Sequence, residues 1–235
     1  MCNRKTSFCL AVVLLAVVLL AGALPLRGQT VPPATPEEEG KLIAVLLSDT
    51  PLKAKMDACR QLAVIGTPKA VPVLAPLLED EKLSHMARYA LEPIPGASVD
   101  QTLRDAMGKL KGRLLVGVLG SIGVRHDAKA VPALMKMLDD PDPETARAAA
   151  GALGKIANAE AAGALREKLG SVPPKVRPAV ADATLACAEA LLAADKPGEA
   201  AALYESVTKA ELPKHFRVAA TYGLIQARQA AEKKK

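Results

Sequence analysis

Aromatic residues are scarce in this sequence, whose 235 residues include no tryptophan, two phenylalanines and three tyrosines. The strands of a β-sandwich are usually rich in aromatic and β-branched side chains, so this scarcity argues against that fold. It also argues against a surface for single-stranded nucleic acid, which needs aromatic rings on which bases stack. Alanine, leucine and valine dominate instead. Such a composition favours helices that pack closely through small side chains.

Motifs for catalysis and metal binding are missing as well. The sequence has no HExxH, no GxSxG, no phosphate loop of the GxxxxGK[ST] type and no CxxC pair. His85, His126 and His215 stand at no metal-ligand spacing and are expected on the surface or in turns. The carboxylates of "DDPDPE" fall at an expected helix end, where capping explains them. The sequence therefore predicts no catalytic residue, no metal site and no cofactor, so the protein is not expected to be an enzyme.

Cysteine and charge limit the function further. Cys59 and Cys187 each lie in an alanine- and leucine-rich helical pattern, which predicts buried free thiols rather than a disulfide. The formal net charge is +6, and Lys233, Lys234 and Lys235 supply half of it at one end. This excess is too mild and too localised to indicate a nucleic-acid partner.

The N-terminal segment has the order of a secretory signal peptide. Arg4 and Lys5 precede an apolar run over 9–26, and small residues at 21–23 predict cleavage after Ala23. An uncleaved anchor formed by 9–26 is the alternative, because the run approaches the roughly 18 to 20 residues that span a bilayer. The remainder is thus expected to be periplasmic or secreted, with membrane contact only if cleavage does not occur. Residues 24–40 hold four prolines and an acidic cluster, and they predict a linker.

A twelve-residue stretch occurs twice, as "KAVPVLAPLLED" at 69–80 and "KAVPALMKMLDD" at 129–140. Each copy contains a leucine, Leu74 or Leu134, that belongs to a longer series. The series runs through Leu74, Leu103, Leu134 and Leu165, at intervals of 29, 31 and 31 residues. Apolar residues spaced by 3, 4 and 7 around these positions form the stripe of an amphipathic helix. A period of 20 to 50 residues is typical of stacked arrays. The pattern predicts helix pairs at 52–79, 82–110, 113–139 and 143–169, after a shorter helix at 37–48.

The turns between these helices carry recognisable end signals. "IGTPKAVP" predicts that a helix ends at Gly66 and that Thr67 caps the next one. "IGVRHDAKAVP" repeats the plan, with Gly123 as the expected end of a helix and Asp127 as the expected cap. In 82–110 the corresponding segment is "EPIPGASVD", whose two prolines predict a bend or altered stacking.

Two segments carry a family resemblance. "DPETARAAAGALGKIANAEAAGALREKL" (142–169) and "VRHDAKAVPALMKMLDD" (124–140) resemble short bacterial HEAT repeats, close to those of phycobilin-lyase-like proteins. The resemblance implies an all-α fold, a right-handed α-α superhelix, with HEAT-like repeats over 41–170. Each pair in such a solenoid buries the stripe of its neighbour. Residues 171–235 are similar to a tetratricopeptide unit, with a "DKPGEA" turn and a restart at Pro213.

This resemblance implies a role in protein–protein interaction. We expect an exported, non-catalytic scaffold whose concave surface is lined by the second helix of each pair, as in the family. On those helices Arg104, Lys136 and Arg166 lie beside the core stripe, and they are the predicted partner-binding residues. A second possibility is a basic surface for an acidic partner, formed by the cations between positions 104 and 129, which are Arg104, Lys109, Lys111, Arg113, Arg125 and Lys129.

Two other functions stay open at this point. The expected last helix, 214–231, is largely apolar and has no evident partner, so the chain could be the solenoid portion of a larger envelope enzyme or electron-transfer protein. A helper protein associated with bilin or haem is a third possibility, which visible absorption by the purified protein would reveal. The sequence does not identify the partner.

Overall fold

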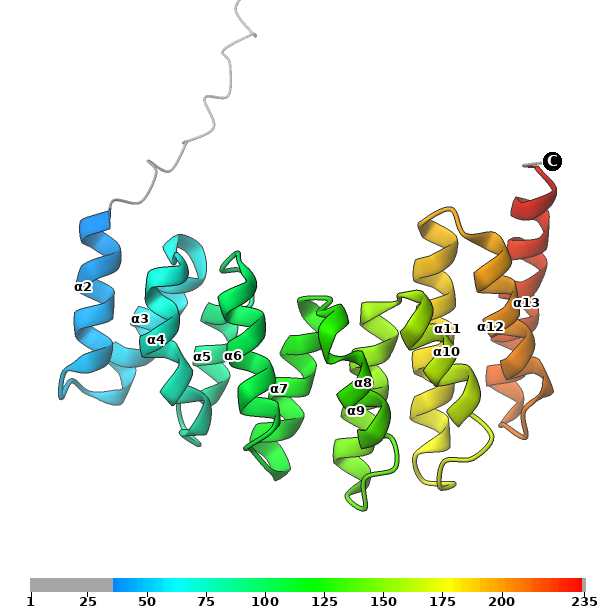
Figure 1. Cartoon of the computed structure of the whole chain (residues 1–235), viewed down its shortest axis with the longest axis horizontal. Helices are drawn as coiled ribbons and strands as arrows, with labels where there is room; N and C mark the ends of the chain where they lie inside the picture. Colours follow the sequence, from blue (N-terminus) through cyan, green and yellow to red (C-terminus); the bar gives the residue numbers. More distant parts are fainter. Residues whose placement is uncertain (1–35, 234–235) are drawn as a thin grey trace, which may run out of the picture. The chain divides into compact units, whose positions relative to one another are not determined.

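Helices form the whole of the described chain. The computed structural model describes residues 36–233, and within this range every regular element is an α-helix or a short 3-10 helix (Figure 1). The first helices of successive pairs are α3 (Leu52–Ile65), α5 (Ser84–Leu91), α7 (Gly112–Val124), α9 (Pro143–Ile156) and α11 (Arg177–Ala193). The second helices are α4 (Val71–Leu74) with its flanking 3-10 turns Pro68–Ala70 and Ala75–Glu79, α6 (Ala97–Met107), α8 (Val131–Met137) after the 3-10 turn Ala128–Ala130, α10 (Ala159–Lys168) and α12 (Pro197–Lys209). Helix α2 (Pro36–Leu47) precedes these pairs and α13 (Lys214–Glu232) follows them.

The four predicted pairs are confirmed, and a fifth follows the same plan. Helices α11 and α12 continue the alternation of first and second helices beyond residue 170. Leu74, Leu103, Leu134 and Leu165 are each fully buried, so the leucine ladder is the core of the array. The fold is an α-helical solenoid, while the tetratricopeptide-like character of 171–235 stays a prediction.

Helix α2 begins inside the predicted linker. The predicted signal peptide, residues 1–23, and most of the linker lie outside the described residues, but 36–40 are helical. Glu39 is buried there, and its carboxylate accepts hydrogen bonds from the backbone N–H and the hydroxyl of Thr67, at 2.6 Å and 2.9 Å. Proline and acidic residues are typical of a first helical turn as well as of linkers, which explains the difference. Between residues 36 and 233, no helix combines the length and the apolar character that crossing a membrane requires.

The predicted caps are present. The side chains of Thr67, Asp127 and Asp142 each accept a hydrogen bond from the backbone N–H two residues further on. Asp142 also accepts a hydrogen bond from the Thr145 hydroxyl, and these bonds hold the pKa of its carboxyl below the usual range. Each cap therefore starts its helix at the position that the repeat pattern predicts.

Gly66 ends α3 as predicted, but the prediction that Gly123 ends a helix is wrong. Helix α7 continues to Val124, and Gly123 is buried within it. A Cβ at Gly123 would lie 2.9 Å from the Cα of Ala152 on α9. Gly154 repeats this contact one repeat later, where a Cβ would lie 2.9 Å from the carbonyl oxygen of Ala183 on α11. These glycines are present because neighbouring first helices touch through their backbones.

The second repeat departs from this plan, as its two prolines predict. Helix α5 has eight residues, and the Arg88 guanidinium lies across α7 at Gly117, donating a hydrogen bond of 3.2 Å to its carbonyl. Ser121 on α7 donates a hydrogen bond of 2.7 Å to Glu92. Burial lowers the pKa of Arg88, and the charge of Glu92 partly offsets this effect. Polar side chains thus join α5 to α7, where the later repeats use glycine and alanine.

Arg125 holds the irregular segment that follows α5. Its guanidinium donates hydrogen bonds of 2.7 Å to the carbonyls of both Glu92 and Ile94, and one of 2.5 Å to the carboxylate of Asp100. Gly96 in this segment has a φ of 109°, a backbone conformation that residues other than glycine rarely adopt. The bond set fixes the start of α6 relative to α7.

The two glycines of α9 provide a test of the backbone contact. Gly154→Ala should lower the free energy of unfolding by about 1–3 kcal/mol, because the added methyl group collides with α11. Gly151→Ala on the exposed side of the same helix should raise it by about 0.5–1 kcal/mol, because no atom lies within 4 Å of the new Cβ. Urea denaturation followed by circular dichroism measures both, and equal stability of the two variants would contradict the contact.

Candidate functional site

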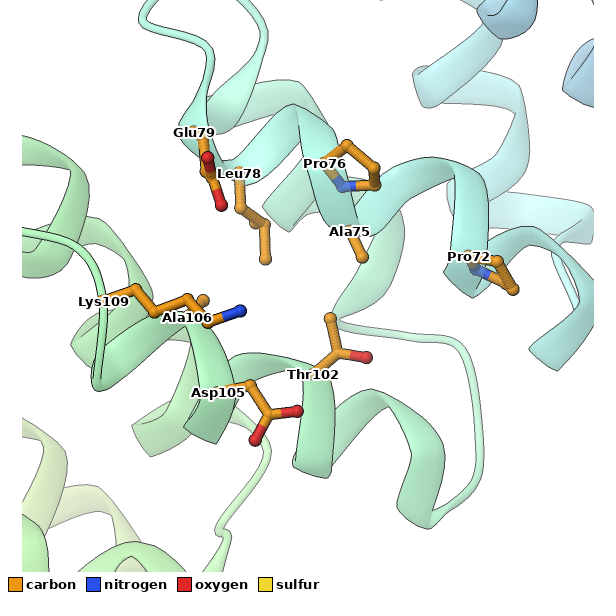
Figure 2. A pocket seen from close by; sticks show the side chains of 9 residues that line it. All are labelled: Pro72, Ala75, Pro76, Leu78, Glu79, Thr102, Asp105, Ala106 and Lys109. Carbon is orange, nitrogen blue, oxygen red and sulfur yellow. The ribbon is translucent and has the colours of Figure 1, made fainter.

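Two grooves lie between successive second helices. The first groove, between the second helix of the first pair and α6, encloses about 330 Å³ (Figure 2). Thr102 and Asp105 reach it from α6 and Lys109 from the turn that follows, as Figure 2 shows. The opposite wall consists of Pro72, Ala75, Pro76, Leu78 and Glu79. Residues 102 and 105 are spaced by 3, so one face of α6, together with the turn after it, supplies one wall of the groove.

The second groove lies between α10 and α12 and encloses about 420 Å³. Its floor consists of small or apolar side chains. Arg166 and Glu199 place opposite charges at its two sides. The complete lining is Ala159, Ala162, Gly163, Arg166, Gly198, Glu199, Ala202 and Leu203. Because Gly163 and Gly198 carry no side chain, a ligand could approach the helix backbones closely.

Both grooves combine charges of both signs with an apolar floor. The first has Glu79, Asp105 and Lys109 above Leu78 and Ala106, and the second has Arg166 and Glu199. A polyanion would meet carboxylates in either groove, which disfavours it. No histidine, cysteine or serine lines either groove. Such a surface suits an extended or helical polypeptide with alternating polar and apolar side chains.

The three predicted partner-binding residues occupy different environments. Arg166 is exposed and lines the second groove, and Lys136 is exposed on α8 but lines neither groove. Arg104 is largely covered, because its guanidinium forms an ion pair with the buried Asp127 and donates to Gln101. Asp127 belongs to the following repeat, so Arg104 joins two repeats inside the fold. Its role as a partner contact stays a prediction, but its guanidinium is already engaged by Asp127, which helical spacing alone does not reveal.

The predicted basic surface is also smaller than the sequence suggests. Arg104 and Arg125 are both used within the fold, and Arg113 lies 3.6 Å from Glu81. Exposed lysines remain at 109, 111 and 129. Counting cations along the chain therefore overestimates the charge that is available to a partner.

Cys59 and Cys187 are buried free thiols, as predicted. Burial raises the pKa of each thiol to about 11, and the charge of Glu199 adds to the effect at Cys187. Among residues 36–233, no three histidine, cysteine, aspartate or glutamate side chains gather where they could hold a metal ion. His215 instead packs against Phe216, with ring centroids 4.3 Å apart.

Sequence reasoning missed Thr102, Asp105 and Lys109 as a set, and it missed Glu199. A signal for Thr102 and Asp105 was present, because their spacing of 3 places them on one face of the helix that carries Leu103, whereas Lys109 follows the end of that helix. No comparable signal indicated Glu199, which lines the same groove as Arg166 only because α10 packs against α12.

Comparisons with known proteins agree with this geometry. Residues 99–186 match the model of the family described as HEAT repeats, and the match continues past the predicted boundary at 170 into α11. The CpcE–CpcF complex of phycocyanin lyase from Nostoc is similar in fold, at 20% identity and a TM-score of 0.50. The likeness covers 89% of this chain and 98% of that chain. The resemblance to HEAT repeats and to phycobilin-lyase-like proteins is thus confirmed at the level of fold.

Two artificial proteins are also similar. An engineered protein shares 20% identity, with 83% of this chain and 98% of that chain covered and a TM-score of 0.46. A designed armadillo repeat protein shares 18% identity, with 80% and 98% covered and a TM-score of 0.44. A search of curated proteins found no match.

The ion pair between Arg104 and Asp127 leads to a prediction about stability. Arg104→Met should lower the free energy of unfolding by about 3 kcal/mol, because it leaves the Asp127 carboxylate covered and unpaired. Adding Asp127→Asn should recover part of the loss, since the amide oxygen can still cap the turn at Lys129. Lys136→Met, at an exposed position, should change stability by less than about 0.5 kcal/mol. Urea denaturation of the three variants measures these changes. An unchanged free energy of unfolding in Arg104→Met would show that the ion pair does not stabilise the fold.

Thiol chemistry tests the burial of the two cysteines. In a protein spanning 29–235, neither Cys59 nor Cys187 should react appreciably with Ellman's reagent at pH 8, because covered thiols with a pKa of about 11 form little thiolate. Both should react rapidly once urea unfolds the chain. Rapid reaction of one thiol in the native state would place that cysteine at the surface.

Proposed function

We propose that this chain, whose residues 99–186 match HEAT repeats, is an exported, non-catalytic scaffold that binds another protein along its second helices. The observation that carries the proposal is the pair of grooves between successive second helices. Each has the mixture of charge and apolar surface that a polypeptide needs. HEAT repeats commonly serve protein–protein interaction, and the similar phycocyanin lyase structure is itself a complex of two chains.

Rigid spacing of the second helices supports this function. Arg104 on α6 pairs with Asp127 in the next repeat, and Lys168 lies 2.5 Å from Asp139 of the preceding pair. These bonds, together with the glycine contacts between first helices, fix adjacent repeats relative to one another. A surface organised before binding loses less conformational entropy when a partner docks.

Export is supported by the pattern at the N-terminus, with its positive start, its apolar run and small residues before the expected cleavage after Ala23. The non-catalytic role is supported by the chemistry of the grooves, whose carboxylates stand on an open surface without a neighbouring histidine, cysteine or serine. Together these features favour a binding protein of the cell envelope.

Charge reversal on the second helices tests the proposal. Tagged protein spanning 29–235 should capture a reproducible set of envelope proteins, as identified by mass spectrometry. Lys136→Glu combined with Arg166→Glu should reduce this capture severalfold, because both exposed cations lie on second helices. Lys53→Glu combined with Lys155→Glu is the matched control, since it reverses two exposed charges on the first helices α3 and α9.

The outcomes separate clearly. Loss of the same proteins from the second-helix variant alone supports binding along that surface. Equal capture by both variants would remove Lys136 and Arg166 from the interface, and no capture by a folded sample would contradict a scaffold function.

A further inference from the structure

A third cavity lies away from both grooves, among α11, α12 and α13. It encloses about 670 Å³, within the range typical of small-molecule sites. Apolar or small side chains form most of its wall. Its lining is Leu185, Glu189, Leu192, Ala193, Tyr204, Val218, Ala219, Tyr222, Gly223 and Gln226. We call it the C-terminal cavity.

Two of the three tyrosines of the chain line this cavity. Tyr204 on α12 is 3% exposed, and its ring lies against the backbone of α13 at Gly223. A Cβ at Gly223 would be 2.3 Å from a ring carbon, so only glycine permits this contact. Tyr222 on α13 is 67% exposed and lines the cavity from the opposite helix. In a chain so poor in aromatic residues, this pairing distinguishes the cavity from the two grooves.

The charge in the C-terminal cavity is of one sign. Glu189 on α11 lines it and is exposed, and no lysine or arginine is part of the lining. Burial raises the pKa of Tyr204, and the negative charge of Glu189 raises it further, so the two side chains share one electrostatic environment. A separate groove of about 530 Å³, also lined by Val218 and Tyr222, contains Lys214 and Arg217. Anions are therefore favoured in that groove and cations in the C-terminal cavity.

We propose that the C-terminal cavity binds a small organic cation with an apolar body. Its ammonium group would pair with Glu189 and contact the ring of Tyr222, since a cation is attracted to the face of an aromatic ring. The apolar body would lie on Leu185, Leu192 and Val218. A free small molecule fits better than a lysine side chain from a partner, because one side chain would fill only part of about 670 Å³.

Benzyltrimethylammonium is a suitable probe, with benzyl alcohol and phenylacetate as neutral and anionic molecules of similar body. Calorimetric titration of the protein spanning 29–235 should detect the cation and give at least tenfold weaker binding for the other two. Glu189→Gln keeps the shape of the side chain and removes its charge, so it should lower the affinity for the cation about tenfold. Tyr222→Leu should weaken it severalfold by removing the ring.

Two matched variants control for general effects of substitution. Glu160→Gln alters an exposed carboxylate on α10, and Tyr89→Leu alters an exposed tyrosine on α5. Neither should change the affinity for the cation. Circular dichroism of every variant establishes that the helices are intact.

Three results would overturn the proposal. They are equal binding of benzyl alcohol, an affinity unchanged by Glu189→Gln, and an equal loss in the control variants. A fourth arm uses the peptide acetyl-Ala-Lys-Ala-amide, which carries the same kind of cation as a protein side chain. Tighter binding of this peptide than of benzyltrimethylammonium would assign the cavity to a protein partner and refute a small-molecule ligand. The second-helix grooves share no residue with this cavity. The outcome here is therefore independent of the test of the proposed scaffold function.

Discussion

The close approach of neighbouring first helices is the constraint on which the rest of this structure depends. No single helix pair is large enough to bury its own apolar stripe, so each pair must be covered by the next. Gly123 against Ala152, and Gly154 against Ala183, bring helix backbones into contact and set the distance between repeats. For α9 and α11, that distance determines how far apart α10 and α12 stand, and hence the width of the second groove. A solenoid built from larger residues at these positions would present a different surface.

Arginine takes over the joining role where the repeat pattern is interrupted. Arg125 binds the backbone carbonyls of the proline-containing segment, and Arg88 fills the space between α5 and α7. Arg104 connects its helix to the next repeat through Asp127. Two of the six cations that looked like a binding surface in the sequence, Arg104 and Arg125, are thus structural. The charges left on the outside are fewer and of mixed sign, which is why a polypeptide fits the grooves better than a polyanion.

The sequence predicted the helices well because the apolar stripe is periodic and the caps repeat with it. It did not predict the end of α7, because "IG" occurs at the end of α3 and inside α7 alike. What differs is the neighbour, since Gly123 contacts α9. Helical spacing placed Arg104 on the correct side of α6 but could not reveal Asp127, 23 residues away. The grooves and the C-terminal cavity were beyond prediction for the same reason, because they depend on distances between helices.

The two kinds of joint between first helices have a consequence for how the molecule comes apart. In a linear array each repeat is stabilised mainly by its neighbours, so cooperativity is only as strong as the contacts at each boundary. Backbone contact unites α7, α9 and α11, whereas the boundary between α5 and α7 combines apolar packing with hydrogen bonds from Arg88, Ser121 and Arg125. Water competes for polar bonds far more effectively than for a dry glycine–alanine contact. We therefore expect the array to behave as two cooperative blocks, which separate at the boundary between α5 and α7 before either block loses its helices.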